Sequence, residues 1–104
     1  MRKVLLLTLF SILSFLGFSQ SIRGTITDEE NNTLPSVNIA ILNTSIGATS
    51  LNDGSYNMEV PANKSMVVAY SFIGYEIEKL RLPMLKRGQN YTLNIQLKAK
   101  NTLL

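Results

Sequence analysis

The chain has 104 residues, of which 45% are hydrophobic and 16% are charged, and it contains no cysteine and no histidine. Without these two residue types, a disulfide framework, a zinc site with the usual ligand spacing and nucleophilic catalysis by thiol or imidazole are all excluded. Ten basic and seven acidic residues give a net charge of +3, but Arg2 and Lys3 lie in a segment that we expect to be removed, which leaves eight basic residues against seven acidic ones. An excess of one charge predicts no nucleic-acid partner.

Residues 1–19 have the layout of a secretory signal peptide. Positive charge at Arg2 and Lys3 precedes an apolar stretch, and Gly17 and Ser19 place small residues at the −3 and −1 positions of a cleavage site after Ser19. The apolar stretch of about 15 residues is shorter than the roughly 20 that span a bilayer, so a retained membrane anchor is the less favoured alternative. We therefore expect an exported chain that begins at residue 20 or 21.

Short stretches in which apolar and polar residues alternate follow one another along the mature chain, a pattern that is typical of half-buried β-strands. Turns rich in polar residues, glycine and proline separate them, and no stretch of the mature chain has the apolar stripe of a helix. The predicted strands cover residues 22–27, 37–42, 47–51, 56–60, 66–75, 77–82 and 91–98.

The first turn is polar throughout and carries three consecutive carboxylates, Asp28, Glu29 and Glu30. Carboxylate oxygens are ligands that calcium prefers, so a calcium site is one interpretation. A solvated turn without a metal is the interpretation that we favour.

A second turn, at Asp53 and Gly54, is the strongest local signal, because both residue types tolerate the positive φ that a tight hairpin requires. These two residues are predicted to shape the turn rather than to carry chemistry. Two registers remain open. A two-residue turn would set Leu51 opposite Tyr56, whereas a three-residue loop with Gly54 in the left-handed conformation would place Ser50 on the face of Tyr56.

Residues 66–75 are the most hydrophobic part of the mature chain, and both of their alternating faces are largely apolar. This pattern predicts a central strand that is covered on both sides, with Gly74 marking a bulge or a bend. Three aromatic residues here, Tyr70, Phe72 and Tyr75, are predicted to pack in the core; a platform on which sugar rings stack is the alternative.

Six or seven short strands joined by tight turns predict an all-β fold, a small sandwich of two packed sheets. We expect the domain to cover residues 20–99 and a short tail to cover residues 100–104. The predicted interior consists of Ile22, Ile26, Val37, Ile39, Ile41, Tyr56, Met58, Val60, Leu93, Ile95 and Leu97.

Five short motifs, taken in order, resemble the carboxypeptidase regulatory-like domain, a small transthyretin-like sandwich of seven strands. The resemblance is greatest to the form found in exported Bacteroidetes proteins, above all at the N-terminus of TonB-dependent outer-membrane receptors. Two positions depart from the family pattern, since Ser36 stands where glycine is usual and Leu51 where aspartate is frequent. The motifs are Gly24-x-Ile26-x-Asp28, Leu34-Pro35-x-Val37-Asn38-Ile39, Asn52-Asp53-Gly54-x-Tyr56, Val60-Pro61 and Ser71-Phe72-Ile73-Gly74-Tyr75.

The resemblance implies a non-catalytic accessory module that needs no cofactor or metal and that binds a protein in the periplasm or at the outer membrane of a Gram-negative bacterium. Contact with the membrane would come only through such a receptor or partner. Whether the chain is a truncated or a single-domain form of a receptor stays open. The alternative is a carbohydrate-binding or adhesion module at the cell surface, which solvent-exposed aromatic side chains on one face would favour.

Overall fold

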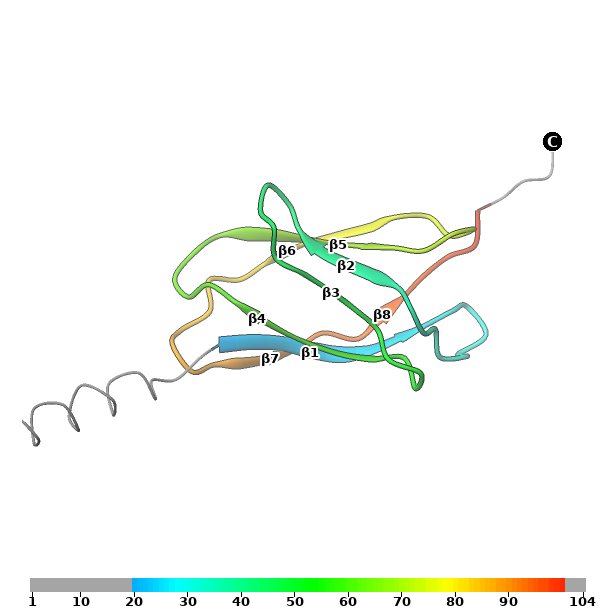
Figure 1. Cartoon of the computed structure of the whole chain (residues 1–104), viewed down its shortest axis with the longest axis horizontal. Coiled ribbons are helices and arrows are strands. Elements are labelled where there is room, and N and C mark those ends of the chain that lie inside the picture. Colours follow the sequence, from blue (N-terminus) through cyan, green and yellow to red (C-terminus); the bar gives the residue numbers. More distant parts are fainter. Residues whose placement is uncertain (1–19, 101–104) are drawn as a thin grey trace, which may run out of the picture.

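The computed structural model describes residues 20–100, so the predicted signal peptide lies outside the described residues. Eight strands form two four-stranded sheets that pack face to face as a β-sandwich (Figure 1). This confirms the predicted all-β fold, with one strand more than the seven expected. In chain order the strands are β1 (Gln20–Thr27), β2 (Asn38–Ile41), β3 (Gly47–Thr49), β4 (Ser55–Val60), β5 (Met66–Ser71), β6 (Glu78–Leu82), β7 (Asn90–Thr92) and β8 (Ile95–Gln96).

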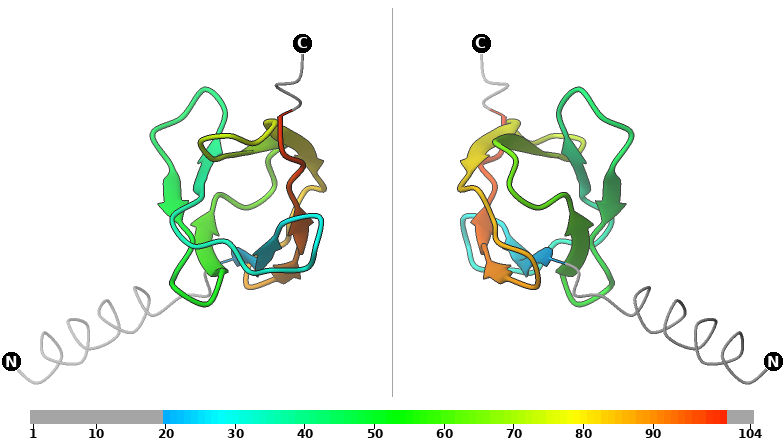
Figure 2. Two further views of the ribbon diagram at one scale, coloured as in Figure 1. Left: turned by 90° about the vertical axis from the view of Figure 1, so that its right-hand side faces the viewer. Right: turned by 90° about the vertical axis from the view of Figure 1, so that its left-hand side faces the viewer.

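The first sheet is built around β1, which is its longest strand. On one side β4 runs antiparallel to β1, with Ile22 opposite Met58. On the other side β7 and then β8 run parallel to β1, and they follow each other along the same edge. The second sheet has the order β3-β2-β5-β6, and all its neighbouring strands are antiparallel. Figure 2 shows the two layers from both ends of the sandwich.

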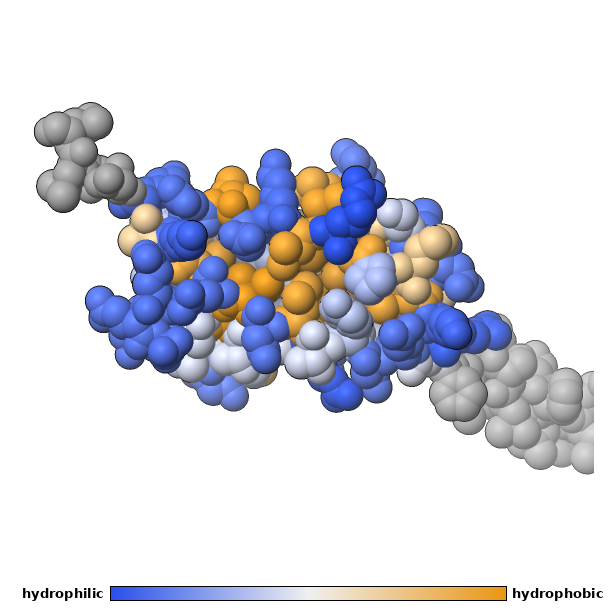
Figure 3. Space-filling model, turned by 180° about the vertical axis from the view of Figure 1, so that it is seen from behind, coloured by the Kyte–Doolittle hydropathy of each residue, from blue (hydrophilic) through white to orange (hydrophobic). Residues whose placement is uncertain are grey.

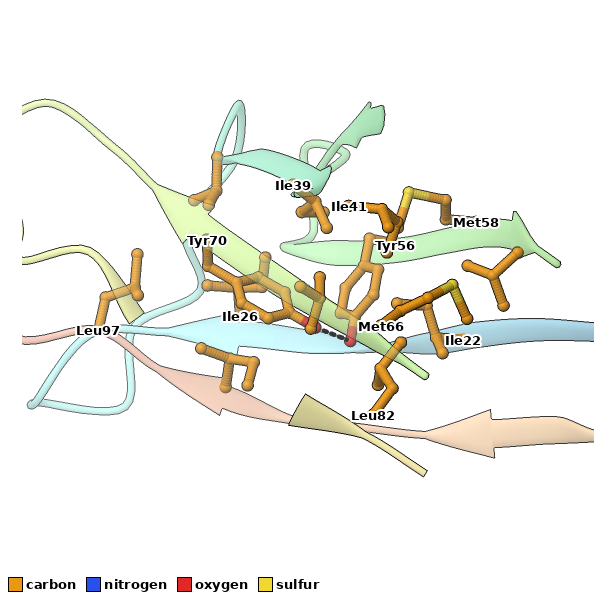
Figure 4. Packing of buried hydrophobic residues seen from close by; sticks show 14 of the residues in the cluster. Ile22, Ile26, Ile39, Ile41, Tyr56, Met58, Met66, Tyr70, Leu82 and Leu97 are labelled. Atoms are coloured by element: carbon orange, nitrogen blue, oxygen red, sulfur yellow. Dashed lines mark hydrogen bonds between the residues drawn. The ribbon is translucent and has the colours of Figure 1, made fainter. Parts of the chain in front are cut away.

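The core lies between the sheets and is formed by the inward-facing residues of the alternating strands. In β4, for example, Tyr56, Met58 and Val60 are buried while the residues between them are not. Ten of the eleven predicted core residues are buried, and the eleventh, Leu93, packs against the core while partly exposed. Six further buried apolar residues complete the core: Leu34, Met66, Val68, Tyr70, Leu82 and Leu85. Figure 4 labels Met66, Tyr70 and Leu82 among the residues of this core.

Two tyrosines join the sheets through the middle of this core. The Tyr70 Oη atom on β5 lies 2.7 Å from the Tyr56 Oη atom on β4 (Figure 4). The Tyr56 hydroxyl also lies 2.6 Å from the carbonyl oxygen of Leu93. A carbonyl oxygen only accepts, so Tyr56 donates to Leu93 and Tyr70 donates to Tyr56. The two rings meet edge to face, with centroids 5.6 Å apart.

The single strand predicted for residues 91–98 is wrong, because the ladder beside β1 is interrupted at Leu93 and Asn94. The Asn94 side chain accepts a hydrogen bond from the backbone N–H of Thr25 at 2.9 Å, so a side-chain oxygen stands where a strand carbonyl would otherwise be. Gly24 makes this approach possible, since a Cβ atom there would lie 2.1 Å from the Leu93 carbonyl oxygen. The interruption divides the predicted strand into β7 and β8.

The predicted double covering of residues 66–75 is also wrong. β5 lies between β2 and β6 and buries Met66, Val68 and Tyr70, but its other face is only half-buried and no element of residues 20–100 packs over it. The strand ends at Ser71.

The turn at residues 51–55 has the three-residue loop. The Leu51 carbonyl accepts from Gly54 N–H at 2.8 Å, the Leu51 N–H donates to the Ser55 carbonyl at 2.8 Å, and Gly54 has a φ of 80°. Ser50 is accordingly buried and Leu51 is exposed. The predicted strand pair does not extend beyond this turn, because β3 joins the second sheet and β4 the first.

Candidate interaction surface

Asp53 and Gly54 shape the turn that passes from one sheet to the other. The Asp53 carboxylate accepts hydrogen bonds from the hydroxyl of Ser55 at 2.6 Å and from its backbone N–H at 3.0 Å. The hydroxyl bond first, and the backbone bond second, lower the pKa of Asp53 below its ordinary value. The carboxylate is therefore engaged inside its own turn.

Gly74 lies in a second turn, where it has a φ of 86° and the N–H of Tyr75 donates to the carbonyl of Phe72 at 3.1 Å. This turn separates the predicted aromatic group. Tyr70 is fully buried, whereas Phe72 and Tyr75 lie against the core with ring centroids 5.8 Å apart. The three rings do not form one exposed platform.

The carboxylates of the first turn hold the loop together. Asp28 accepts from the backbone N–H groups of Glu30 and Asn32 at 2.8 and 2.9 Å, and Glu29 accepts from the N–H of Ala99 at 3.1 Å. The bonds from Asn32 and Glu30 lower the pKa of Asp28, against a smaller opposing effect of desolvation. In the part of the chain that the structure describes, no three acidic side chains gather as a metal site would require.

The polar side chains of the described core likewise have hydrogen-bond partners. Ser50, for instance, donates to the Leu34 carbonyl at 2.7 Å and accepts from Val37 N–H at 2.9 Å, which fixes the loop before β2. Within residues 20–100 every buried side-chain nitrogen or oxygen has a hydrogen-bond partner. The same residues include no helix with the length and hydrophobicity to cross a bilayer.

β6 is a free edge strand of five residues. It pairs with β5 on one side, and no backbone hydrogen bond within residues 20–100 reaches it from the other. The remaining edge strands offer fewer unpaired backbone groups to a partner strand. β3, β7 and β8 have three residues or fewer, and β4 runs close to β3. An edge strand presents unpaired N–H and C=O groups that another strand can bind.

An apolar strip lies beside this edge, on the side where the sandwich is open. β6 of the second sheet and β7 and β8 of the first sheet border that side (Figure 2), and hydrophobic surface runs between them (Figure 3). Leu80 of β6, Tyr91 of β7 and Leu93 pack against the core while remaining partly exposed. We call these three residues the apolar seam.

The outer face of β6 is cationic. Lys79 and Arg81 are exposed and lie opposite Ala69 and Val67 of β5. Arg81 donates to the Ser65 hydroxyl at 3.2 Å, and neither cation pairs with a carboxylate in the described residues. β6 thus alternates between Leu80 and Leu82 on the inside and two cations on the outside.

The sequence pattern assigns no function to any of these β6 residues. Alternation predicted the strand, but pattern alone does not tell an edge strand from an inner one. The signal that was available is the pair Lys79 and Arg81, because charged residues, lysine above all, are frequent on exposed sheet edges.

The two layers, their connections and the free edges define an all-β sandwich module. A family model for the CarboxypepD_reg-like domain matches residues 22–104. The chain belongs to this family. It is also 31% identical over 87 residues to TonB-dependent receptor P3 of Formosa agariphila; the aligned part is 78% of this chain and 9% of that receptor.

Solved structures agree with the fold. A chain of a mutant type II cohesin–X-dockerin complex from Acetivibrio cellulolyticus superposes with a TM-score of 0.67 at 12% identity, covering 82% of this chain and 61% of its own. A 3-chlorocatechol 1,2-dioxygenase from Rhodococcus opacus gives a TM-score of 0.63 at 12% identity, covering 81% of this chain and 61% of its own. A protein of unknown function from Bacteroides fragilis gives a TM-score of 0.58 at 21% identity, covering 85% of this chain and 30% of its own. At these identities the likeness concerns the fold alone.

Proposed function

We propose that this chain is an exported, non-catalytic interaction module that binds a protein partner at the cell envelope through a sheet edge. The observation that carries the proposal is the free edge of β6 beside the apolar seam. Backbone groups on such an edge supply affinity when an extended segment adds to the sheet, and pockets for alternate side chains supply specificity.

The comparisons support a location in the envelope. The family match and the identity to a TonB-dependent receptor fit a module that acts in the periplasm or at the outer membrane, after removal of residues 1–19. Since the chain spans only about a tenth of that receptor, transport is no part of the proposal, and the module acts as an accessory to a receptor or as a separate adaptor.

The polar chemistry of the domain supports a role without catalysis. The carboxylates of Asp28 and Asp53 are held by hydrogen bonds inside their own turns, and the two most buried tyrosines bond to each other. The aromatic residues on which a glycan-binding role would rest lie in or against the core. These observations favour a protein partner over a carbohydrate.

Photo-crosslinking in cells tests the proposal. A photoreactive amino acid is placed on each edge in turn, at Thr49, Asn57, Lys79 and Thr92, which are exposed residues of β3, β4, β6 and β7. Expression in a Bacteroidetes host should give a discrete envelope-protein adduct from at least one edge, and an exposed turn position such as Asn52 serves as the control. Irradiation that yields no edge-dependent adduct from any of the four positions would overturn the proposed function.

A further inference from the structure

We propose that the β6 edge accepts an extended segment of a partner protein in which acidic residues alternate with apolar ones. This inference rests on the proposed function and adds the chemistry of the partner. It follows from three properties of β6: the free backbone groups, the cations on its outer face, and the apolar seam along its inner face.

The cations of β6 determine which residue types are favoured at the outward-facing positions of the partner segment. In a two-stranded ladder, residues directly opposite each other on one face interact, and opposite charges stabilise the pair while like charges destabilise it. A strand added to β6 brings one residue opposite Lys79 and another opposite Arg81. Neither cation has a carboxylate partner within the described residues, so both are available to an aspartate or glutamate of the incoming strand.

The apolar seam determines which residue types are favoured at the inward-facing positions of the partner segment. A partner residue opposite Leu80 would point into the open side of the sandwich (Figures 2 and 3). The apolar seam residues Tyr91 and Leu93 belong to the facing sheet edge and are only partly buried. A valine or isoleucine there would cover apolar surface that is now in contact with water. At the start of β6, Glu78 lies on this inner side as well, so a basic residue fits the position opposite it.

A second copy of the chain is the wrong partner for this edge. If two β6 strands paired antiparallel about Leu80, Lys79 of each copy would lie opposite Arg81 of the other. Two like-charge pairs would then oppose the dimer. The same two cations therefore discourage self-association and favour an acidic segment.

Synthetic peptides test the inference on the purified full chain. The acidic peptide has the core Val-Glu-Val-Glu-Lys, which in antiparallel alignment meets Leu82, Arg81, Leu80, Lys79 and Glu78 in that order. The basic peptide has the core Val-Lys-Val-Lys-Glu. Binding is followed by the amide chemical shifts of β6 and by the hydrogen exchange of its amides, which a new ladder should slow.

We expect the acidic peptide to bind about tenfold more tightly than the basic one, with its largest shifts in β6 and at Leu93. In the variant Lys79→Glu/Arg81→Glu the order of the two peptides should invert. The matched control is Lys86→Glu/Arg87→Glu, which changes the net charge equally but at exposed positions in the loop after β6. This control should keep the preference for the acidic peptide.

Three results would overturn the inference. Shifts confined to another edge would remove β6 as the site, while an edge-dependent adduct in the crosslinking experiment would leave the proposed function standing. Equal loss of preference in both double variants would show that net charge alone attracts the peptide. If neither peptide perturbs β6 in a chain whose spectrum shows a folded sandwich, the inference is wrong. Lys79 and Arg81 would then serve only to protect an exposed edge strand from pairing.

Discussion

The hydroxyl of Tyr70 donates to the hydroxyl of Tyr56, which in turn donates to the carbonyl of Leu93, so that three groups from both sheets share one chain of hydrogen bonds. The direction of this chain makes the two tyrosines unequal. Tyr56 both accepts and donates, whereas Tyr70 stands at the donor end, and each hydroxyl can be removed separately by changing tyrosine to phenylalanine.

We expect Tyr56→Phe to destabilise the domain more than Tyr70→Phe. Tyr70→Phe removes one hydrogen bond and leaves Tyr56 bonded to Leu93, which should cost about 0.5–1.5 kcal/mol. Tyr56→Phe leaves the Tyr70 hydroxyl and the Leu93 carbonyl without partners, which should cost about 1–3 kcal/mol. Urea unfolding of both variants measures the difference. Equal losses would contradict the direction assigned to the hydrogen bonds.

The tyrosine pair should also make the domain sensitive to alkali. Burial raises the pKa of both tyrosines above the ordinary value of 10.0, and the bond to Tyr56 raises that of Tyr70 further. The stabilisation of the fold by the two protonated tyrosines is therefore fully present below about pH 10. It declines above pH 10, because the unfolded chain releases protons that the folded chain retains. Each pH unit above 10 should lower the folding equilibrium constant by up to about tenfold per tyrosine.

The measurement is the urea midpoint between about pH 8 and pH 11, together with phenolate absorbance to show when tyrosine ionises. Tyr70→Phe should flatten the alkaline decline, since one of the two protected protons is then absent. A midpoint that stays constant above pH 10 would argue against buried, protonated tyrosines.

The glycines of the two turns offer a matched comparison. Gly54 and Gly74 have nearly the same φ, 80° and 86°. A Cβ at Gly74 would meet nothing within 4 Å, whereas at Gly54 it would lie 2.8 Å from Thr33 Cβ and 2.9 Å from the Ile26 carbonyl oxygen. Gly74→Ala should cost about 1–2 kcal/mol from backbone strain alone, and Gly54→Ala about 3 kcal/mol or more. Thermal and urea unfolding will rank them, and the reverse order would refute the packing described at the Asp53–Gly54 turn.

Ser36 offers a change that should stabilise the protein. It has a φ of 63° and is exposed. Ser36→Gly should raise the free energy of unfolding by about 0.5–1 kcal/mol, because relief of left-handed strain exceeds the added freedom of the unfolded chain. Ser45→Gly is the control, since Ser45 is exposed without a positive φ and should gain nothing. A loss of stability in Ser36→Gly would show that the serine side chain has a role of its own.

The sequence predicted the sandwich and most of its core because alternation at period two is a local property. The alternation of Tyr56, Met58 and Val60 with polar residues predicts which face of this strand is buried, and it requires no information about distant residues. The interruption at Leu93 and Asn94 could not be predicted in the same way. It depends on the close approach of Gly24, about 70 positions earlier, and both residues fit a regular strand when each is considered alone.

The same limit applies to the candidate surface. Residues 66–71 have two apolar faces, yet only one is covered, because whether a second layer exists is decided by the whole topology and not by the strand itself. Likewise, the composition of β6 allowed either an inner or an edge position. The order β3-β2-β5-β6 places it outside, and only that order makes Lys79, Leu80 and Arg81 neighbours of an empty position in the sheet.

The parallel pairing of β1 with β7 and β8 has a mechanical consequence. The described chain enters at one end of the sandwich with Gln20 and leaves at the other with Lys100 (Figure 1). Tension applied to the two ends pulls these neighbouring strands in opposite directions along their length, so the bonds that join them share the load instead of opening one by one. We therefore expect the domain to resist tension between Gln20 and Lys100 more strongly than a domain whose terminal strands separate one bond at a time.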